Sequence, residues 1–228
     1  MTGARSEIMN KGTDILLIRH GETDWNAVKR LQGHIDIPLN QQGERQALAL
    51  GHALRAEALD AVISSDLQRA RQTALAVAQQ QSVPVHSDAG LRERCYGAFE
   101  GLNYSEIGQR YPAAYAAWQN RDLDAQYPPG ERVAETLRQF YERTVARILH
   151  WAQRHQGQKI ALVAHGGVLE CAYRAARAMP LAVPRDFPIL NASVNRLHVK
   201  DGQLQLVVWG EVGHLEAQAL DEVDRRVP

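Results

Sequence analysis

The sequence has little of several features that mark particular classes of protein. Its two cysteines, Cys95 and Cys171, lack CxxC spacing, so we expect free thiols in a reducing cytoplasm, without a disulfide or a zinc site. No apolar run approaches the ~18 residues that a membrane span needs. Net charge is also absent: Lys and Arg together number 26, as do Asp and Glu, so no chain-wide field favours nucleic acid or an anionic membrane.

Several familiar catalytic motifs are missing as well. The chain has no HExxH, GxSxG or Walker A sequence, so metalloprotease, serine hydrolase and P-loop functions have no motif to rest on. Residues 1–12 are polar and lack the apolar core of a secretory signal, and we predict a flexible N-terminal tail there. We place a single α/β domain at 13–212, which is long enough for one large core, and a polar C-terminal tail at 213–228.

Two apolar segments end in residues that can carry chemistry. Ile15 to Ile18 form a short apolar run that is followed by Arg19, His20 and a glycine. A second run, at 159–164, is followed by His165 and two glycines. Both read as buried strands, and in open α/β sheets ligands bind beyond the carboxyl ends of the strands. The two histidines are therefore predicted to share one site.

The rest of the pattern alternates strands with helices. We expect a loop at 24–38, a helix after an Asn40 N-cap, and a strand at 61–63 followed by a helix to about residue 80, capped by Ser65 or Asp66. Further expectations are an edge strand at 83–86, a loop over the site at 88–101, short helices at 104–122 broken at Pro112, a long helix whose apolar stripe runs from Val133 to Trp151, a helix at 167–178, and a hairpin at 193–209 turning at Asp201-Gly202. The fold class predicted is α/β, a three-layer sandwich with a mixed, mostly parallel central sheet and helices on both faces.

The residue types at these strand ends and loops suit phosphoryl transfer. Arg19 and Arg69 carry guanidinium forks that match phosphoryl oxygens. A neutral imidazole can accept a phosphoryl group covalently, and a second one can stabilise its oxygens. Gly166-Gly167 at a helix start offers backbone N–H donors for an anion. A carboxyl group whose pKa is raised toward neutrality can protonate the departing alkoxide.

These residues also carry a resemblance. The segment Arg19-His20-Gly21-Glu22-Thr23-Asp24-Trp25-Asn26 is similar to the RHGET/S-x-x-N motif of the histidine phosphatase superfamily, the phosphoglycerate mutase-like family. The match continues through residues 33–39, Gly43, residues 64–74, Leu91-Arg92-Glu93, Gly97, Glu100-Gly101 and His165-Gly166-Gly167. Together these motifs span residues 14 to 167, and jointly they are very specific for that family.

The resemblance implies a function and a role for each residue. His20 would be the phosphoryl acceptor and Glu93 the proton donor, while His165 completes the catalytic set. Arg19, Asn26, Arg69 and Gly166 would bind the phosphate. Members of the family need no metal and no cofactor, so the expected enzyme is a histidine acid phosphatase-type phosphatase that forms a covalent phosphohistidine on a small phosphorylated metabolite. The expected partners are that substrate and, by base rate, a second copy in a homodimer, with neither nucleic acid nor membrane.

Two other functions stay open. We call the predicted loop at 88–101, which carries Glu93, the acid loop. Phosphoglycerate mutases of the family carry extra basic residues between this loop and the second histidine, whereas this chain has only isolated Arg110 and Arg121 between Gly101 and Glu131, which favours a phosphatase. A non-catalytic phospholigand-binding regulatory domain is disfavoured because every required residue is intact.

Several residues of the sequence bear on these assignments without deciding them. Glu22 and Glu100 are alternative acids to Glu93, with capping or loop hydrogen bonding as their expected roles. Arg71, Arg92 and Arg94 are expected to be solvated or paired locally. Arg132 and Glu170 depart from the family pattern near the leaving group. The substrate therefore stays open.

Overall fold

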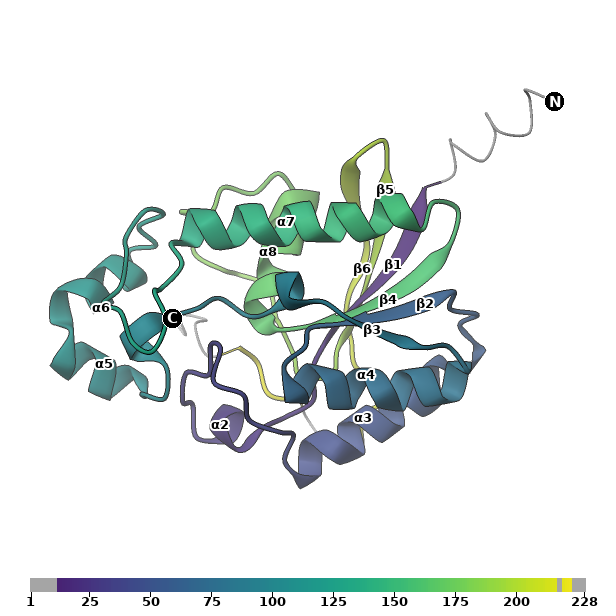
Figure 1. Ribbon diagram of the computed structural model, residues 1–228, viewed down its shortest axis with the longest axis horizontal. Helices are drawn as coiled ribbons and strands as arrows, with labels where there is room; N and C mark the ends of the chain where they lie inside the picture. Colours follow the sequence, from purple (N-terminus) through teal and green to yellow (C-terminus); the bar gives the residue numbers. More distant parts are fainter. Residues whose placement is uncertain (1–11, 217–218, 223–228) are drawn as a thin grey trace.

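A six-stranded sheet forms the centre of the protein. The computed structural model describes residues 12–216 and 219–222, so the predicted N-terminal tail lies outside the described residues apart from Gly12. The sheet order is β3-β2-β4-β1-β5-β6 (Figure 1). The strands are β1 (Thr13–Arg19), β2 (Ala61–Ser64), β3 (Val85–Ser87), β4 (Lys159–Ala164), β5 (Val194–Lys200) and β6 (Gln203–Glu211). The pairs among β1 to β4 are parallel, while β5 runs antiparallel to both β1 and β6.

Helices cover both faces of this sheet. In Figure 1, α7 and α8 lie on one face and α3 and α4 on the other, which confirms the predicted fold class. The helices are α2 (Asp24–Ala27), α3 (Gln41–Ala53), η1 (Leu54–Ala56), α4 (Gln68–Gln81), η2 (Ala89–Leu91), η3 (Gly97–Phe99), α5 (Tyr104–Arg110), α6 (Pro112–Gln119), α7 (Leu137–Arg154) and α8 (Gly166–Ala176). Across the described ranges, none of these helices combines the length and apolarity required to cross a membrane.

The apolar run that begins the domain is explained by burial on both faces. Ile15 and Leu17 pack with α7 and α8, whereas Leu16 and Ile18 pack with α3 and α4, and all four are almost fully buried. Side chains of a strand alternate between the two faces of a sheet, so a central strand with helices on both sides must be apolar at every position. This pattern makes β1 the centre of both cores.

Strand register brings the chemistry-bearing ends together. Arg19 at the end of β1 lies opposite Ala164 at the end of β4, and Ser64 at the end of β2 lies opposite Val163. The residues that follow these ends therefore leave the sheet at one edge, as the sequence predicts. His20 and His165 are the first residues after β1 and β4.

The closing hairpin also follows its sequence signal. Asp201 and Gly202 form the whole two-residue turn between β5 and β6, with φ angles of 52° and 73°. A type I′ turn requires positive φ at both central residues, which Asp-Gly tolerates well. The antiparallel pair completes the mixed sheet.

Three sequence expectations are wrong in detail. The expected loop at 24–38 contains the short helix α2, whose capping box joins Thr23 and Asn26. Neither Ser65 nor Asp66 caps α4, because Leu67 is the N-cap and accepts no hydrogen bond through its side chain. The long helix begins at Leu137 after a Thr136 cap, not near Val133.

The competing interactions explain the last two differences. Ser65 Oγ lies 2.8 Å from His165 Nε2, and Asp66 forms an ion pair with Arg92, so neither side chain is used for the helix cap. Val133 is 68% exposed and contributes nothing to the apolar stripe of α7. The stripe itself is confirmed by buried Phe140, Thr144 and Ile148.

The insertion between the acid loop and α7 has a small core of its own. α5 and α6 lie at one end of the molecule, away from the sheet (Figure 1). Phe99, Ile107 and Tyr127 are buried there, with Trp118 packed against them. Phe99 and Tyr127 stack with ring centroids 4.7 Å apart. This aromatic cluster gives the insertion a core separate from the two that flank the sheet.

Candidate active site

His20 is held in a defined tautomer. Its ring is buried, with 3% of the residue exposed, and Nδ1 lies 2.7 Å from the Gly21 carbonyl oxygen. A carbonyl only accepts hydrogen bonds, so Nδ1 carries the proton and Nε2 keeps a lone pair. Burial, followed by the charges of Arg69 and Arg19, lowers the pKa of His20 well below its ordinary value. The ring is therefore neutral at pH 7, with its free nitrogen available as a nucleophile.

The second histidine faces the first across the strand ends. The ring centroids of His20 and His165 are 5.2 Å apart, with the rings inclined by 60°. His165 Nε2 lies 2.8 Å from Ser65 Oγ, and Nδ1 has no hydrogen-bond partner among the described residues. Burial, then the charge of Arg69, lowers the pKa of His165 well below its ordinary value. A neutral imidazole with one uncommitted nitrogen remains at the site.

Two buried arginines place unpaired donors around these rings. Arg19 donates from Nη1 to the Ile189 carbonyl at 2.6 Å, and Arg69 donates to the carbonyls of Gly33 (2.8 Å) and Ile35 (3.0 Å). Within the described ranges, Nε and Nη2 of Arg19 and Nε of Arg69 have no hydrogen-bond partner. Burial lowers the pKa of Arg69 to about 10, so it stays protonated at neutral pH. Buried cationic donors without acceptors indicate a site for an anion.

Glu93 reaches this site from the loop between β3 and α5. Its Oε1 accepts the Arg94 N–H at 2.7 Å and its Oε2 accepts the Gly167 N–H at 3.0 Å. Burial, with a further contribution from the charge of Glu222, raises the pKa of Glu93 to about 7, against the effect of these two N–H groups. A Cβ at position 167 would lie 2.3 Å from Glu93 Oε1, so glycine is needed for this approach. Glu93 can exchange a proton near neutral pH.

Asn26 and Gly166 complete the set of predicted residues. Asn26 lines the same pocket as Arg19, His20, Arg69 and Glu93. Its Oδ1 accepts from the Thr23 backbone and hydroxyl, at 3.1 and 3.0 Å, so its amide nitrogen remains as the donor. Gly166 is the first residue of α8, directly after His165. We call Arg19, His20, Asn26, Arg69, Glu93, His165 and Gly166 the strand-end site.

The two alternative acids have other partners. Glu22 Oε1 accepts from Asn40 at 2.9 Å beside the start of α3. Glu100 Oε1 accepts the backbone N–H groups of His34 and Tyr96, at 3.0 and 2.9 Å. Both carboxylates therefore serve the local loop structure that the sequence suggests for them. Glu93 is left as the acid whose oxygens face the strand-end site.

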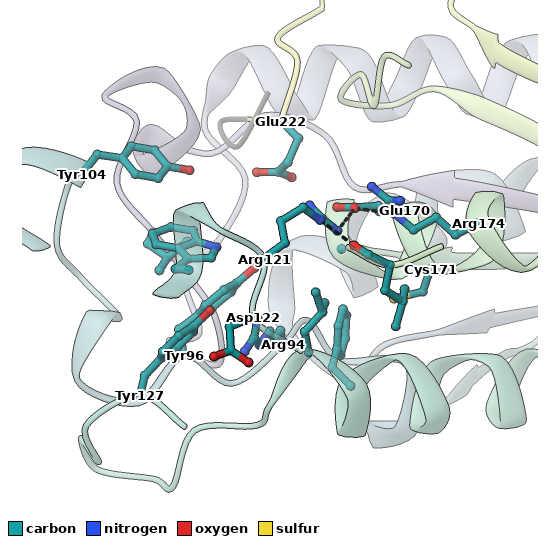
Figure 2. A pocket seen from close by; sticks show the side chains of 16 residues that line it. Arg94, Tyr96, Tyr104, Arg121, Asp122, Tyr127, Glu170, Cys171, Arg174 and Glu222 are labelled. Atoms are coloured by element: carbon teal, nitrogen blue, oxygen red, sulfur yellow. Dashed lines mark hydrogen bonds and ion pairs between the residues drawn. The ribbon is translucent and has the colours of Figure 1, made fainter. Parts of the chain in front are cut away.

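A second pocket opens beside the strand-end site and is lined by the insertion. We call it the aromatic pocket, formed by Arg94, Tyr96, Tyr104, Trp118, Arg121, Tyr127, Glu170 and Glu222 (Figure 2). Arg121 reaches across it, donating to Glu170 at 2.5 Å and to the Leu181 carbonyl at 2.7 Å. Glu170 also accepts from Arg174 at 2.7 Å. Burial opposes ionisation of Glu170, but the charges of Arg121 and Arg174 hold its pKa below the ordinary value.

Arg94 was misjudged from the sequence. It was expected to be solvated or locally paired, but only 3% of it is exposed and it lines the aromatic pocket. Its guanidinium carbon lies 4.6 Å from the Tyr127 ring centroid and 5.4 Å from that of Tyr96, while Nε donates to the Glu135 carbonyl. Nη2 has no hydrogen-bond partner among the described residues. Tyr127, which encloses Arg94 from the other side than the nearby Tyr96, comes from a segment whose proximity the sequence does not reveal.

Glu222 was also missed. It lies in the segment 213–228 that the sequence left as a polar tail, yet it lines both the strand-end site and the aromatic pocket. Its Oε2 lies 2.9 Å from Arg19 Nη2. No periodicity or motif near the C-terminus could have identified it. The assignment of residues 13–212 as one domain, with separate tails, stays a prediction.

Comparisons with known proteins show which family the chain belongs to. The family model described as histidine phosphatase superfamily (branch 1) matches residues 15–212. Phosphoglycerate mutase-like protein 4 of Arabidopsis thaliana is 38% identical over 206 residues, covering 89% of this chain and 87% of that protein. A metal-independent phosphoserine phosphatase of the same plant is 36% identical over 214 residues, covering 92% and 87%.

A solved structure leads to the same family. Bacillus stearothermophilus YhfR matches with a TM-score of 0.81 and 34% identity, over 89% of this chain and 98% of that one. The resemblance inferred from the motifs is therefore confirmed over nearly the whole chain. The chain belongs to the histidine phosphatase superfamily.

Proposed function

We propose that this protein hydrolyses phosphomonoesters of a small phosphorylated metabolite through a covalent phosphohistidine at His20. Family membership bears out the sequence-based expectation of a phosphatase for such metabolites. The observation that carries the proposed mechanism is the bond from His20 Nδ1 to the Gly21 carbonyl, which leaves Nε2 as a nucleophile among unpaired arginine donors. This combination matches what phosphoryl transfer demands of a protein.

The first step transfers the phosphoryl group to the protein. The lone pair of His20 Nε2 attacks phosphorus and the ester P–O bond breaks. Arg19 and Arg69 stabilise the charge on the phosphoryl oxygens, supported by the uncommitted nitrogen of His165. Glu93, whose pKa is raised to about 7, gives its proton to the departing alkoxide.

The second step returns the site to its starting state. Water attacks the phosphohistidine, and the Glu93 carboxylate formed in the first step takes a proton from that water. The P–N bond breaks, Nε2 regains its lone pair, and inorganic phosphate leaves. Glu93 thus acts first as an acid and then as a base, which a pKa near 7 allows.

The aromatic pocket is where we propose that the leaving group binds. Arg94 offers there a buried Nη2 without a hydrogen-bond partner among the described residues, and Arg121, which is paired with Glu170, lines the same pocket. A carboxylate is the anion that such donors suit on a small metabolite. Phosphoserine and phosphoglycerate, which appear in the names of the two plant relatives, both carry one. We therefore propose a phosphorylated hydroxy or amino acid as the substrate class.

The mutase alternative gains one argument from Arg94. The sequence showed only isolated Arg110 and Arg121 near the leaving group, but Arg94 and Arg121 share the wall of the aromatic pocket. If these arginines retained a carboxylate-bearing product, the phosphoryl group could be transferred back to that product from His20. Incubation with 2- and 3-phosphoglycerate separates the two functions, since a mutase interconverts them and a phosphatase releases phosphate.

A generic assay tests the proposed function. The protein is incubated with an aryl phosphate and a metal chelator, and phosphate release is followed. We expect hydrolysis that falls by on the order of 10⁴ or more in His20→Ala. His52→Ala, an exposed histidine on α3, is the matched control and should keep full activity. No release from any phosphomonoester, with phosphate still bound, would instead support the non-catalytic regulatory domain.

We also propose a cytoplasmic location and a homodimeric assembly. A cytoplasmic location is supported by two buried cysteines that are both free thiols. Homodimer formation has only the general frequency of symmetric dimers behind it. Light scattering of the purified chain measures the latter directly.

A further inference from the structure

The C-terminal segment Ala219–Glu222 is fixed to the strand-end site through its backbone. The Leu220 carbonyl accepts from Asn191 N–H at 2.9 Å and from Arg19 Nη1 at 3.3 Å. Asp221 Oδ1 accepts the Ile189 N–H at 2.8 Å and forms an ion pair with Arg185 at 3.1 Å. The Glu222 N–H donates to the Ile189 carbonyl at 3.0 Å. These bonds give the last described residue a defined place.

That place puts a carboxylate against the anion-binding groups. Glu222 Oε2 lies 2.9 Å from Nη2 of the fully buried Arg19. Glu222 Oε2 also packs against Gly166, the first residue of α8. A Cβ built at Gly166 would lie 1.7 Å from this oxygen. Arg19 and Gly166 are two of the groups proposed above to hold the substrate phosphate. The carboxylate and a phosphate would therefore compete for the same donors.

The fit of this carboxylate is incomplete. Arg19 Nη2 is close to Glu222 but makes no hydrogen bond of good geometry, and Arg19 Nε and Arg69 Nε also have no acceptor within the described residues. A tetrahedral anion can reach more of these donors than one planar carboxylate does. Two anions so close together in a buried site repel each other strongly. A phosphate can therefore displace Glu222, and it must do so to bind fully.

We propose that Glu222 is an internal competitor that occupies the anion site of the free protein and weakens the binding of phosphate and phosphomonoesters. The proposal rests on the strand-end site being the phosphoryl site of the proposed function. Glu222 lines both the strand-end site and the aromatic pocket, where Figure 2 shows its carboxylate, so one substrate that fills both spaces would meet it. A small anion that contacts only the strand-end site must displace Glu222 with those contacts alone. A substrate that also binds in the aromatic pocket has further contacts with which to offset that cost.

Binding of inorganic phosphate to the full chain, measured by calorimetry, tests this directly. We expect Glu222→Gln to bind phosphate more tightly by about five- to tenfold, because one nearby negative charge is removed. The KM for an aryl phosphate should fall by a similar factor. Glu216→Gln is the matched control, since it removes the same charge from an exposed position earlier in the C-terminal segment. It should bind phosphate as the unaltered chain does.

A second variant keeps the Glu222 carboxylate but weakens the contacts that hold the C-terminal segment in place. Asp221→Asn weakens the ion pair with Arg185, and we expect tighter phosphate binding by about two- to threefold. Unchanged or weaker phosphate binding in Glu222→Gln would overturn the proposal. The proposal would also be overturned if Glu222→Gln raised the KM for phosphoserine and left the KM for an aryl phosphate unchanged. That result would make Glu222 a ligand for the substrate's ammonium group.

These readouts separate the proposal from the function on which it rests. Phosphate binding needs no turnover, so tighter binding by Glu222→Gln without any hydrolysis would support the competitor and contradict the phosphatase. Hydrolysis by the unaltered chain, together with unchanged phosphate affinity in Glu222→Gln, would contradict the competitor alone.

Discussion

The strand-end site and the aromatic pocket share a boundary but are built in opposite ways. Arg19 ends β1, and His20 and His165 are the first residues after the neighbouring parallel strands β1 and β4, with the His20 N–H donating to the Ala164 carbonyl of β4. The aromatic pocket is assembled from α5, α6, α8, the acid loop and the C-terminal segment, none of which belongs to the sheet, and the Arg121–Glu170 ion pair joins the insertion to α8. The first can hold a fixed reaction geometry, while the second can change with the insertion. Under the proposed function, chemistry and substrate choice are thus separated in the fold.

The separation predicts that changes in the strand-end site affect every substrate. Arg69→Ala should lower kcat/KM by roughly 10²–10³ for aryl and alkyl phosphates alike, because charge-assisted hydrogen bonds worth about 1.5–3 kcal/mol each are lost. Arg69→Lys should recover little of this, since an ammonium cannot reproduce the planar fork. Steady-state kinetics on both substrate types measures the effect.

A matched control exists on the same helix. Arg71 lies two positions along α4, and its side chain is exposed. Arg71→Ala should therefore leave kcat/KM within about twofold, as substitutions of exposed surface residues usually do. Equal losses in the two variants would mean that Arg69 acts through general charge, not through contact with the substrate.

Glu93 lies at the boundary and should show a substrate-dependent effect. Glu93→Gln should lower kcat by about 10²-fold for an alkyl phosphate and much less for an aryl phosphate, whose leaving group needs little protonation. Kinetics with a matched alkyl and aryl pair measures the difference. Equal losses on both substrates would place the proton donor elsewhere.

The raised pKa of Glu93 gives the same claim a pH signature. The acid is needed in its protonated form, and burial raises its pKa to about 7. The alkyl-to-aryl ratio of kcat/KM should therefore be constant below that pH and decline as pH rises through it, by up to tenfold per unit. The ratio cancels the ionisation of the substrate phosphate. A ratio that stays flat to pH 9 would rule out Glu93 as the acid.

The smallest effect is expected in the aromatic pocket. Arg94→Met keeps the apolar stem between Tyr96 and Tyr127 and removes the unpaired donor. The KM for phosphoserine or 3-phosphoglycerate should rise by about tenfold or more, while that for an aryl phosphate should change little. Arg45→Met, at an exposed position on α3, should alter neither KM. A uniform rise for all substrates would erase the distinction between the two pockets.

Predictability from sequence follows the same division. The end of β1 could be predicted because a continuous apolar run, buried on both faces, stops at Arg19 and His20. The apolar strand β4 likewise stops just before His165. Of the seven predicted site residues, five line one pocket, namely Arg19, His20, Asn26, Arg69 and Glu93, and the roles of all seven remain proposals.

The residues that were missed have no local pattern. Arg94 is buried because Tyr96 and Tyr127, from either side of α5 and α6, enclose its guanidinium, and neither contact has a sequence period. Glu222 reaches Arg19 across 203 positions of sequence, from a segment of polar residues. Ser65 was expected to cap a helix, but its hydroxyl meets His165 instead. Tertiary contacts decide such cases, and they leave no trace in neighbouring residues.

The central claim is that a covalent step on the protein precedes the attack of water. The stereochemical course at phosphorus, followed with an isotopically chiral phosphorothioate monoester hydrolysed in isotope-labelled water so that the thiophosphate product is itself chiral, tests this most directly. Two in-line displacements at phosphorus, the first by His20 and the second by water, predict overall retention of configuration. Inversion would show a single direct attack by water and would contradict the phosphohistidine.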